Sequence, residues 1–141
     1  LPMTTPPLNA PGRPQIQVDG TRAERPVTIA DRVVAYEATA TAWHERYRVP
    51  FWVSETSNLS LPVDEGSAWL AALVGSLGSL GERGLPVRGI CWYSRGDQLD
   101  WDSVLVPPAG VVTRVGLFDM DRRPRPAHGA FRRLSSAGAP A

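Results

Sequence analysis

Residues 51–55 have the sequence FWVSE and residues 87–94 have the sequence VRGICWYS, and these two stretches decide the fold. Both are short, apolar and bounded by turn-forming residues, as buried strands are. Helical patterns at 28–48 and 66–83 each precede one of them, and a shorter helical pattern at 126–134 comes last. Strands that are apolar on both faces and alternate with helices are typical of a parallel sheet. The sequence therefore predicts an α/β fold.

Both long helices have one apolar stripe, with residues recurring at spacings of three and four. Thr28 or Asp31 is suited to cap the first helix, and Gly84 followed by Pro86 is suited to end the second. The stripes comprise Ile29, Val33, Tyr36, Ala40, Trp43 and Tyr47 in the first helix, and Trp69, Leu70, Leu73, Val74, Leu77 and Leu80 in the second. We expect Trp43, Trp52 and Trp69 in the core.

The chain divides into three parts by composition. Residues 1–26 are rich in Pro, Gly, Thr and Asn, which predicts an extended arm with QIQV at 15–18 as a candidate short strand. Residues 27–134 carry the predicted helices and strands. Residues 135–141, SSAGAPA, are expected to form a disordered tail. A length of 141 residues suits one domain.

Composition argues against several classes of protein. Fifteen cationic and fourteen acidic residues give a net charge of +1, too weak a field to attract nucleic acid or membrane. No apolar stretch approaches the roughly 18–20 residues of a membrane helix, and the start of the chain lacks a signal-peptide pattern. We therefore expect a soluble, cytoplasmic protein. Cys91 is the only cysteine and lies in an apolar run, so we expect it to be buried, and no metal site is expected.

Glu55 closes the first strand and is the only acidic residue in or next to it. In parallel barrels the reactive groups lie at the carboxyl ends of the strands, so this carboxylate is a candidate catalytic group. The second strand ends in CWYSRGDQLDW at 91–101, which combines aromatic rings with hydrogen-bonding side chains. Aromatic faces pack on a pyranose ring, and carboxylates and amides bind its hydroxyls. The pattern favours a sugar site.

Three motifs in the right order resemble family 1 glycoside hydrolases. The family ends its seventh strand with Ile-Thr-Glu-Asn-Gly, whose Glu is the nucleophile, and this chain has Val-Ser-Glu-Thr-Ser at 53–57. The family's eighth strand carries Trp-Ser-Leu-Leu-Asp-Asn-Phe-Glu-Trp, which resembles residues 92–101 with one extra residue before Asp97. The family motif Arg-Phe-Gly-Leu-x-x-Val-Asp resembles RVGLFDMD at 114–121.

The resemblance implies the C-terminal portion of a (β/α)8 TIM barrel, comprising its last two strand–helix units and incomplete on its own. It implies a retaining glycosidase with Glu55 as the nucleophile and no cofactor. The expected substrate-binding residues are Trp92, Asp97, Gln98, Asp100 and Trp101. Two departures, Thr-Ser at 56–57 instead of Asn-Gly and an aspartate at position 100 instead of Glu, predict a reshaped or degraded sugar subsite.

The acid/base that a retaining glycosidase needs is absent from this sequence. That second carboxyl group lies about 5–5.5 Å from the nucleophile, and the family supplies it from an Asn-Glu-Pro motif. A complete barrel takes roughly 200–250 residues, and a quarter of one would leave sheet edges uncovered. We therefore expect the chain to be incomplete. Its expected partners are carbohydrate and either the missing N-terminal part of the barrel or a second copy.

Two other functions stay open. A non-catalytic carbohydrate-binding or assembly module would keep the scaffold without the chemistry, and the altered pair at 56–57 and the missing acid/base favour it. Arginines at 122–125 and 132–133 suggest nucleic-acid binding. They lack interleaved aromatic residues and a recognised fold signature, so we expect a solvated surface and no nucleic-acid or membrane partner.

Overall fold

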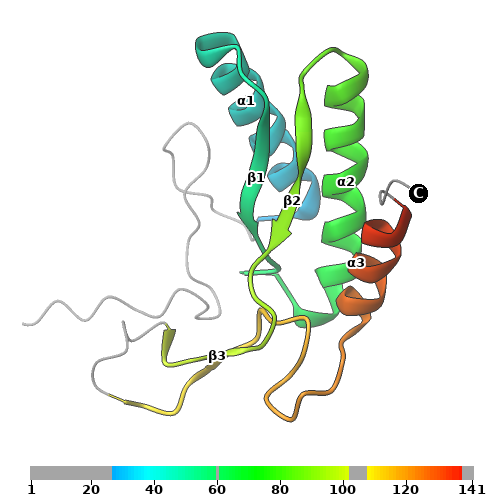
Figure 1. Cartoon of the computed structure of the whole chain (residues 1–141). Helices are drawn as coiled ribbons and strands as arrows, with labels where there is room; N and C mark the ends of the chain where they lie inside the picture. The colour runs from blue at the N-terminus through cyan, green and yellow to red at the C-terminus, as the bar shows by residue number, and fades with distance from the viewer. Residues whose placement is uncertain (1–26, 60, 102–107, 138–141) are drawn as a thin grey trace, which may run out of the picture.

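A computed structural model of the chain describes residues 27–59, 61–101 and 108–137 (Figure 1). Its elements in chain order are α1 (Ile29–Tyr47), β1 (Phe51–Thr56), the short 3-10 helix η1 (Val63–Glu65), α2 (Gly66–Glu82), β2 (Val87–Trp92), β3 (Gln98–Leu99), β4 (Val112–Thr113) and α3 (Pro126–Ala137). This mixture of helices and strands agrees with the α/β class predicted from the sequence. The predicted arm at 1–26, with its candidate strand at 15–18, lies outside the described residues.

β1 and β2 form a parallel pair, as the alternation of helices and strands predicts. The helices α1 and α2 pack against each other on one side of this pair, and α3 packs on α2 (Figure 1). Among the described elements no helix lies over the other side of the two strands. We call that side the open face. It is made by the exposed strand residues Trp52, Ser54, Glu55, Arg88 and Cys91.

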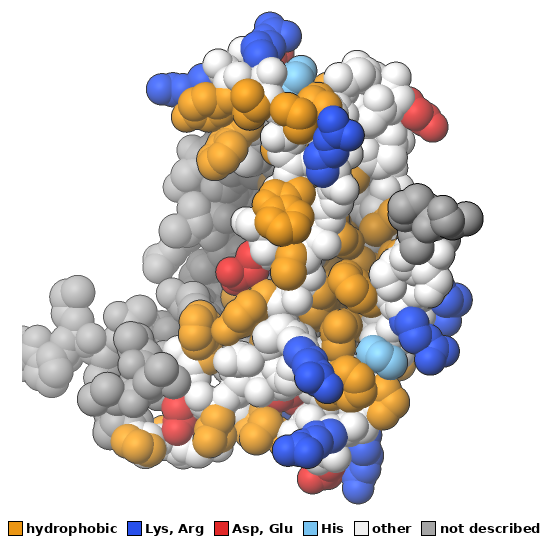
Figure 2. Space-filling view, viewed as in Figure 1, with side chains coloured by type: hydrophobic (Ala, Val, Ile, Leu, Met, Phe, Trp, Pro, Cys, Tyr) orange, Lys and Arg blue, Asp and Glu red, His pale blue; other side chains and the backbone are white. Residues whose placement is uncertain are grey.

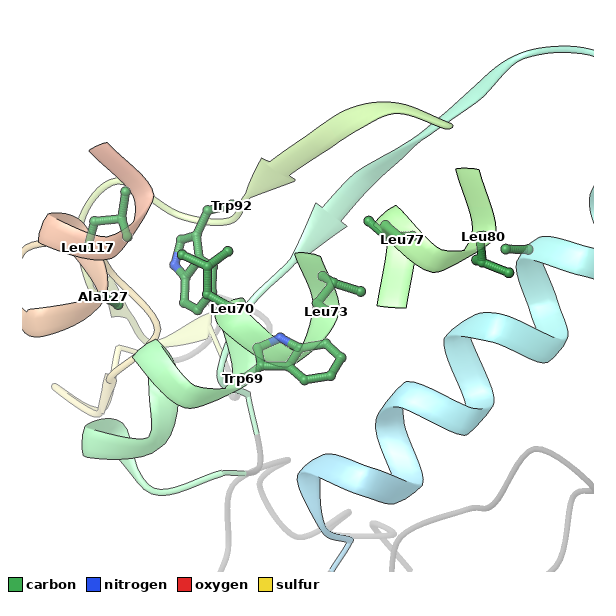
Figure 3. Packing of buried hydrophobic residues seen from close by; sticks show 9 residues of the cluster. Trp69, Leu70, Leu73, Leu77, Leu80, Trp92, Leu117 and Ala127 are labelled. Carbon is green, nitrogen blue, oxygen red and sulfur yellow. The ribbon is translucent and has the colours of Figure 1, made fainter. Parts of the chain in front are cut away.

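The core lies between the helices and the covered side of the strand pair (Figure 3). Trp69, Leu70, Leu73 and Leu80 of α2 are completely buried, which confirms the apolar stripe predicted for this helix. Full burial of each such side chain contributes roughly 1.5–3 kcal/mol, so α2 is the central element of the fold. From α1, the residues that pack on this core are Ile29, Val33, Tyr36 and Ala40.

Three side chains expected in the interior are exposed. Trp43 and Trp52 are 61% and 65% exposed, and Cys91 is exposed too, so these three predictions are wrong. Trp52 and Cys91 lie on the open face, which the helices do not cover. Trp43 lies past the part of α1 that contributes to the core, and its ring packs edge-on against Tyr47 with centroids 5.9 Å apart. The expectation of burial holds for Trp69.

The ends of the long helices follow the predicted capping chemistry. The Thr28 hydroxyl accepts from the backbone N–H of Asp31 at 3.2 Å, and the Asp31 carboxylate accepts from the N–H of Thr28 at 2.8 Å. This reciprocal pair is a capping box, in which Thr28 is the N-cap and Asp31, the alternative cap, is the third residue of the helix. After α2, Gly84 has a φ of 90° and its N–H donates to the carbonyl of Gly81. A left-handed residue just past a helix is most easily a glycine.

The last third of the chain differs most from the predicted pattern. Residues 95–113, where neither a helix nor a strand is predicted, contain the antiparallel β3–β4 pair, and the segment 114–121 forms two isolated bridges through Phe118. α3 begins at its predicted proline but continues three residues past the expected end at 134, since the first helix-breaking residue beyond that point is Gly138. None of the helices in the described ranges is long and apolar enough to cross a membrane.

Candidate functional site

A bulge in β1 turns Glu55 onto the open face. Val53 pairs with Ile90 in the parallel ladder. Thr56, three residues further along β1, pairs with Trp92, only two residues further along β2. Side chains of a regular strand alternate between its faces, so position 55 would otherwise lie on the same covered side as Val53. The extra residue exposes Glu55 and buries Thr56 instead, which is how bulges re-aim side chains at functional sites.

Thr56 is fixed by three hydrogen bonds. The indole N–H of Trp69 donates to its Oγ1 at 3.1 Å, and the hydroxyl of Tyr36 lies 3.2 Å from the same atom. The Thr56 carbonyl accepts from the N–H of Tyr93 at 2.8 Å. The residue next to Glu55 is therefore tied to α1, to α2 and to the end of β2, so the direction of the bulge is set by the core.

Glu55 borders a hollow at the carboxyl ends of β1 and β2. The hollow is shallow and open to solvent, and it is lined by Glu55, Ser57, Leu59, Tyr93, Trp101, Thr113 and Val115. Only Glu55 among these lining residues is charged. The rings of Tyr93 and Trp101 lie 5.7 Å apart between centroids, tilted by 46°. The hollow is therefore an open surface beside Glu55 and not an enclosed pocket.

Arg32 holds the wall of the hollow that follows β1. Its guanidinium donates to the carbonyl oxygens of Ser57, at 3.2 Å, and of Leu59. It also lies 5.4 Å from the ring centroid of Trp69. Burial lowers the pKa of Arg32, yet a guanidinium keeps its charge in proteins. A partly buried cation therefore holds two of the residues that line the hollow.

Trp101 is the predicted sugar-binding residue that lines the hollow beside the carboxylate. Trp92 is 6% exposed and points into the core (Figure 3), where its Nε1 donates to the carbonyl of Val115 at 3.0 Å. The amide nitrogen of Gln98 donates to Oγ of Ser94 at 2.7 Å. Trp92 and Gln98 therefore support the hollow and do not line it.

Asp97 and Asp100 also bind groups of the chain. The Asp97 carboxylate accepts from the N–H of Gly116 at 2.9 Å and pairs with the guanidinium of Arg125. Asp100 accepts from the N–H of Val111 at 2.8 Å. That bond, helped by the two preceding backbone N–H groups, holds the pKa of Asp100 below its ordinary value of 3.8 despite the opposing effect of burial. Substrate binding by these two aspartates stays a prediction.

Tyr93 lines the hollow where the sequence suggested Trp92. Aligned from Tyr93, the residues Tyr-Ser-Arg-Gly-Asp-Gln-Leu-Asp-Trp at 93–101 match the nine-residue eighth-strand motif without the extra residue. This alignment without a gap could have identified Tyr93. It was missed because Trp92, one position earlier, is identical to the first residue of the motif. Thr113 gave no such signal, because nothing in its local sequence marks it as part of a site.

Figure 2 shows the open face, with hydrophobic side chains running along the strand pair and an acidic side chain among them. Within the described ranges no three His, Cys, Asp or Glu side chains come together in a group that could hold a metal ion. The arrangement thus offers one exposed carboxylate beside aromatic rings, which suits attack on, or hydrogen bonding to, a ligand with an apolar ring face.

Comparisons with known proteins support the fold. No family model matches the chain, and no curated protein is similar to it by sequence. The crystal structure of the beta-glycosidase BGL167 is similar, with a TM-score of 0.67 and 21% sequence identity. The match covers 86% of this chain but 31% of that chain, so this chain spans less than a third of the neighbour's length. The chain therefore has a glycosidase-like fold.

Proposed function

We propose that this chain is the nucleophile-bearing part of a retaining glycosidase and that Glu55 is the nucleophile. The observation that carries the proposal is the bulge, which turns one carboxylate out of the core and into a hollow with Tyr93 and Trp101. The structural likeness to a beta-glycosidase supports it. In this role an oxygen of Glu55 attacks the anomeric carbon, and the bond to the leaving-group oxygen breaks as the glycosyl–enzyme ester forms.

The second carboxyl group must come from outside the described residues, because Glu55 is the only acidic side chain that lines the hollow. That group protonates the leaving-group oxygen and then, as a base, activates the water that hydrolyses the ester. It has to reach within about 5–5.5 Å of the nucleophile. The open face leaves room for it, since no described helix covers that side of the strands.

The partner that we propose for the open face is a set of further strand–helix units, the remainder of a (β/α)8 barrel. In this arrangement the chain supplies the last two units. About two thirds of the neighbour's chain has no counterpart in this chain, which supports this partner. The hydrophobic side chains along the open face, among them Trp52 at 65% exposure, also support it, because a contiguous exposed apolar surface marks an interaction site (Figure 2).

In this proposal the apolar face of a sugar ring packs on Trp101 and Tyr93. Trp92, Asp97, Gln98 and Asp100 act behind the hollow, where they hold the loops that carry those rings. Which sugar is accepted then depends on which of its hydroxyl groups the residues of the hollow and of the missing barrel units can bind.

The test uses activated 2-deoxy-2-fluoro glycosides, which trap the ester and carry their own leaving group, so that no acid/base is needed. Intact mass and peptide mapping should find one added sugar on Glu55. Glu55→Gln should abolish the adduct, while Glu82→Gln, which changes an exposed glutamate of α2, should not. No adduct on protein shown to be folded, or an adduct on another residue, would overturn the assignment of Glu55.

A second candidate function is carbohydrate binding without catalysis. It is favoured by one observation, that the lining of the hollow contains a single carboxylate. Saturable binding of methyl glycosides by a chain that never forms a covalent adduct would support this function.

A further inference from the structure

Thr113 has a buried hydroxyl without a hydrogen-bond partner in the described structure. The residue is 2% exposed and lines the hollow that Glu55 borders, yet its Oγ1 has no partner among the described residues. Thr56 provides the contrast, because it is 5% exposed and its Oγ1 has two partners. A buried polar group left unpaired costs stability, so native structures that keep one often use it for binding or catalysis.

The backbone holds Thr113 firmly in this position. It is the last residue of β4 and pairs with Gln98 of β3, and its carbonyl accepts from the N–H of Val115 at 3.0 Å. The neighbouring wall is less constrained, since Trp101 is 43% exposed. Because Thr113 and the half-exposed Trp101 line the same hollow, a ligand that displaces this ring can reach the Thr113 hydroxyl.

The chemistry of the lining selects the kind of ligand. A threonine hydroxyl can donate one hydrogen bond and accept others, which matches a hydroxyl group on the ligand. Glu55 is the one charged residue in this lining, and its carboxylate disfavours anions and accepts hydrogen bonds from hydroxyls. Tyr93 and Trp101 offer ring faces for the C–H side of a pyranose. These features together fit a neutral sugar better than a phosphate or a carboxylate.

We propose that Thr113 is a specificity-determining residue that hydrogen-bonds a hydroxyl of a neutral pyranoside held between Glu55 and the Tyr93–Trp101 pair. The inference rests on the proposed function, in that it names the ligand class of the same hollow. Thr113 would supply a hydrogen bond to the ligand from a buried hydroxyl that has no other partner in the described structure.

The experiment compares Thr113→Val, which keeps the shape and removes the hydroxyl, with Thr113→Ser, which keeps the hydroxyl. Binding of methyl glucoside, galactoside, mannoside and xyloside is followed by chemical-shift titration, and stability by thermal unfolding. Thr113→Val should bind the best of these probes about three- to tenfold more weakly, as expected for one hydrogen bond. Its unfolding temperature should equal or exceed that of the wild type, because an unpaired buried group is removed. Thr113→Ser should bind like the wild type.

Thr56→Val is the matched control for the stability measurement, since it removes a buried hydroxyl that has two partners and should lower the unfolding temperature. The inference is overturned if Thr113→Val unfolds clearly earlier than the wild type, if it binds the probes equally well, or if the wild type binds none of them. If the wild type binds the probes and forms no covalent adduct, the assignment of Glu55 as nucleophile fails while the role of Thr113 stands. If Thr113→Val forms the adduct as well as the wild type does, the role of Thr113 fails while the assignment of Glu55 stands.

Discussion

The indole nitrogen of Trp69 lies 3.1 Å from Oγ1 of Thr56, so a fully buried residue of α2 is hydrogen-bonded to the residue that follows Glu55. The bond joins the most buried helix to the bulge that exposes the carboxylate. Tyr36 approaches the same oxygen from α1. The position of the candidate nucleophile is therefore coupled to the packing of the core.

Thr56→Val should destabilise the fold, because it leaves the buried indole N–H of Trp69 without its acceptor, while the Tyr36 hydroxyl keeps the Glu55 carbonyl at 3.5 Å. Unsatisfied buried donors cost about 1–3 kcal/mol each, so a loss of roughly that size is expected in chemical denaturation. Thr39→Val serves as the control. The Thr39 hydroxyl is exposed and bonds only to a carbonyl of its own helix, and its loss should cost less than about 0.5 kcal/mol. Equal effects of the two substitutions would contradict this account of Thr56.

The sequence was sufficient to predict the order of the three α-helices and of β1 and β2, and the face of α2 that packs in the core, but not the short elements η1, β3 and β4. Periodicity identifies an apolar stripe whenever a helix meets a core on one side, and capping residues mark its ends. The prediction of burial failed for Trp52 and Cys91. An apolar strand is expected to be covered on both faces, but the helices of the described structure cover only one face of β1 and β2. Burial of such residues depends on what lies over the strand, which their own sequence does not record.

The candidate site was predictable only in part, for a related reason. Glu55 lies at the end of β1, a place that is visible in the sequence, and Trp101 lies two residues after β3 in a stretch whose aromatic and hydrogen-bonding side chains suggested a sugar site. The bulge depends on how two strands pair, Val53 with Ile90 and Thr56 with Trp92, and no local sequence pattern predicts it. Tyr93 faces the hollow because the chain leaves the ladder after Trp92, a choice made by long-range contacts such as the bond from Trp92 to the carbonyl of Val115.

Gly116→Ala should disrupt the loop behind the hollow. A Cβ at this position would lie 2.3 Å from the carbonyl carbon of Gly96 and 2.4 Å from the nitrogen of Asp97, both backbone atoms that cannot swing aside. We expect a loss at least as large as the roughly 1–3 kcal/mol of an overpacked core. Gly78→Ala is the opposite case, with open space around its Cβ in a helix, and should stabilise by about 0.5–1 kcal/mol. Urea denaturation of both variants gives the comparison, and a harmless Gly116→Ala would refute the close approach.

Removing Arg125 should be far more damaging than removing other arginines nearby. Its partner Asp97 has a side chain only 2% exposed, so Arg125→Gln leaves a buried carboxylate without its cation, at a cost of about 3–5 kcal/mol. The pair of Arg123 with Asp121 is largely exposed, and Arg123→Gln should change stability by less than about 1 kcal/mol. Denaturant titration of both variants should show this contrast. Comparable losses would mean that the buried pair is not what holds the loop.

Acid should selectively weaken the contact between Asp100 and the segment at 109–111. Hydrogen bonds from that backbone hold the folded-state pKa of Asp100 below its ordinary value of 3.8, so the ionised form is favoured by folding. The stabilisation is therefore fully present above the ordinary pKa and is lost as the pH falls through the lower, folded-state value. Asp100→Asn is a suitable comparison, because asparagine tolerates the φ of 54° at this position and cannot titrate.

The measurement is the unfolding temperature of the wild type and of Asp100→Asn across a series from neutral to strongly acidic pH. The wild type should be the more stable protein at neutral pH, since a charged acceptor makes the stronger hydrogen bond to the N–H of Val111. The difference should shrink once the pH drops below 3.8, while other carboxyl groups affect both proteins alike. A difference that stays constant or grows in acid would show that Asp100 does not hold the loop through its charge, because protonation would then leave its contacts unchanged.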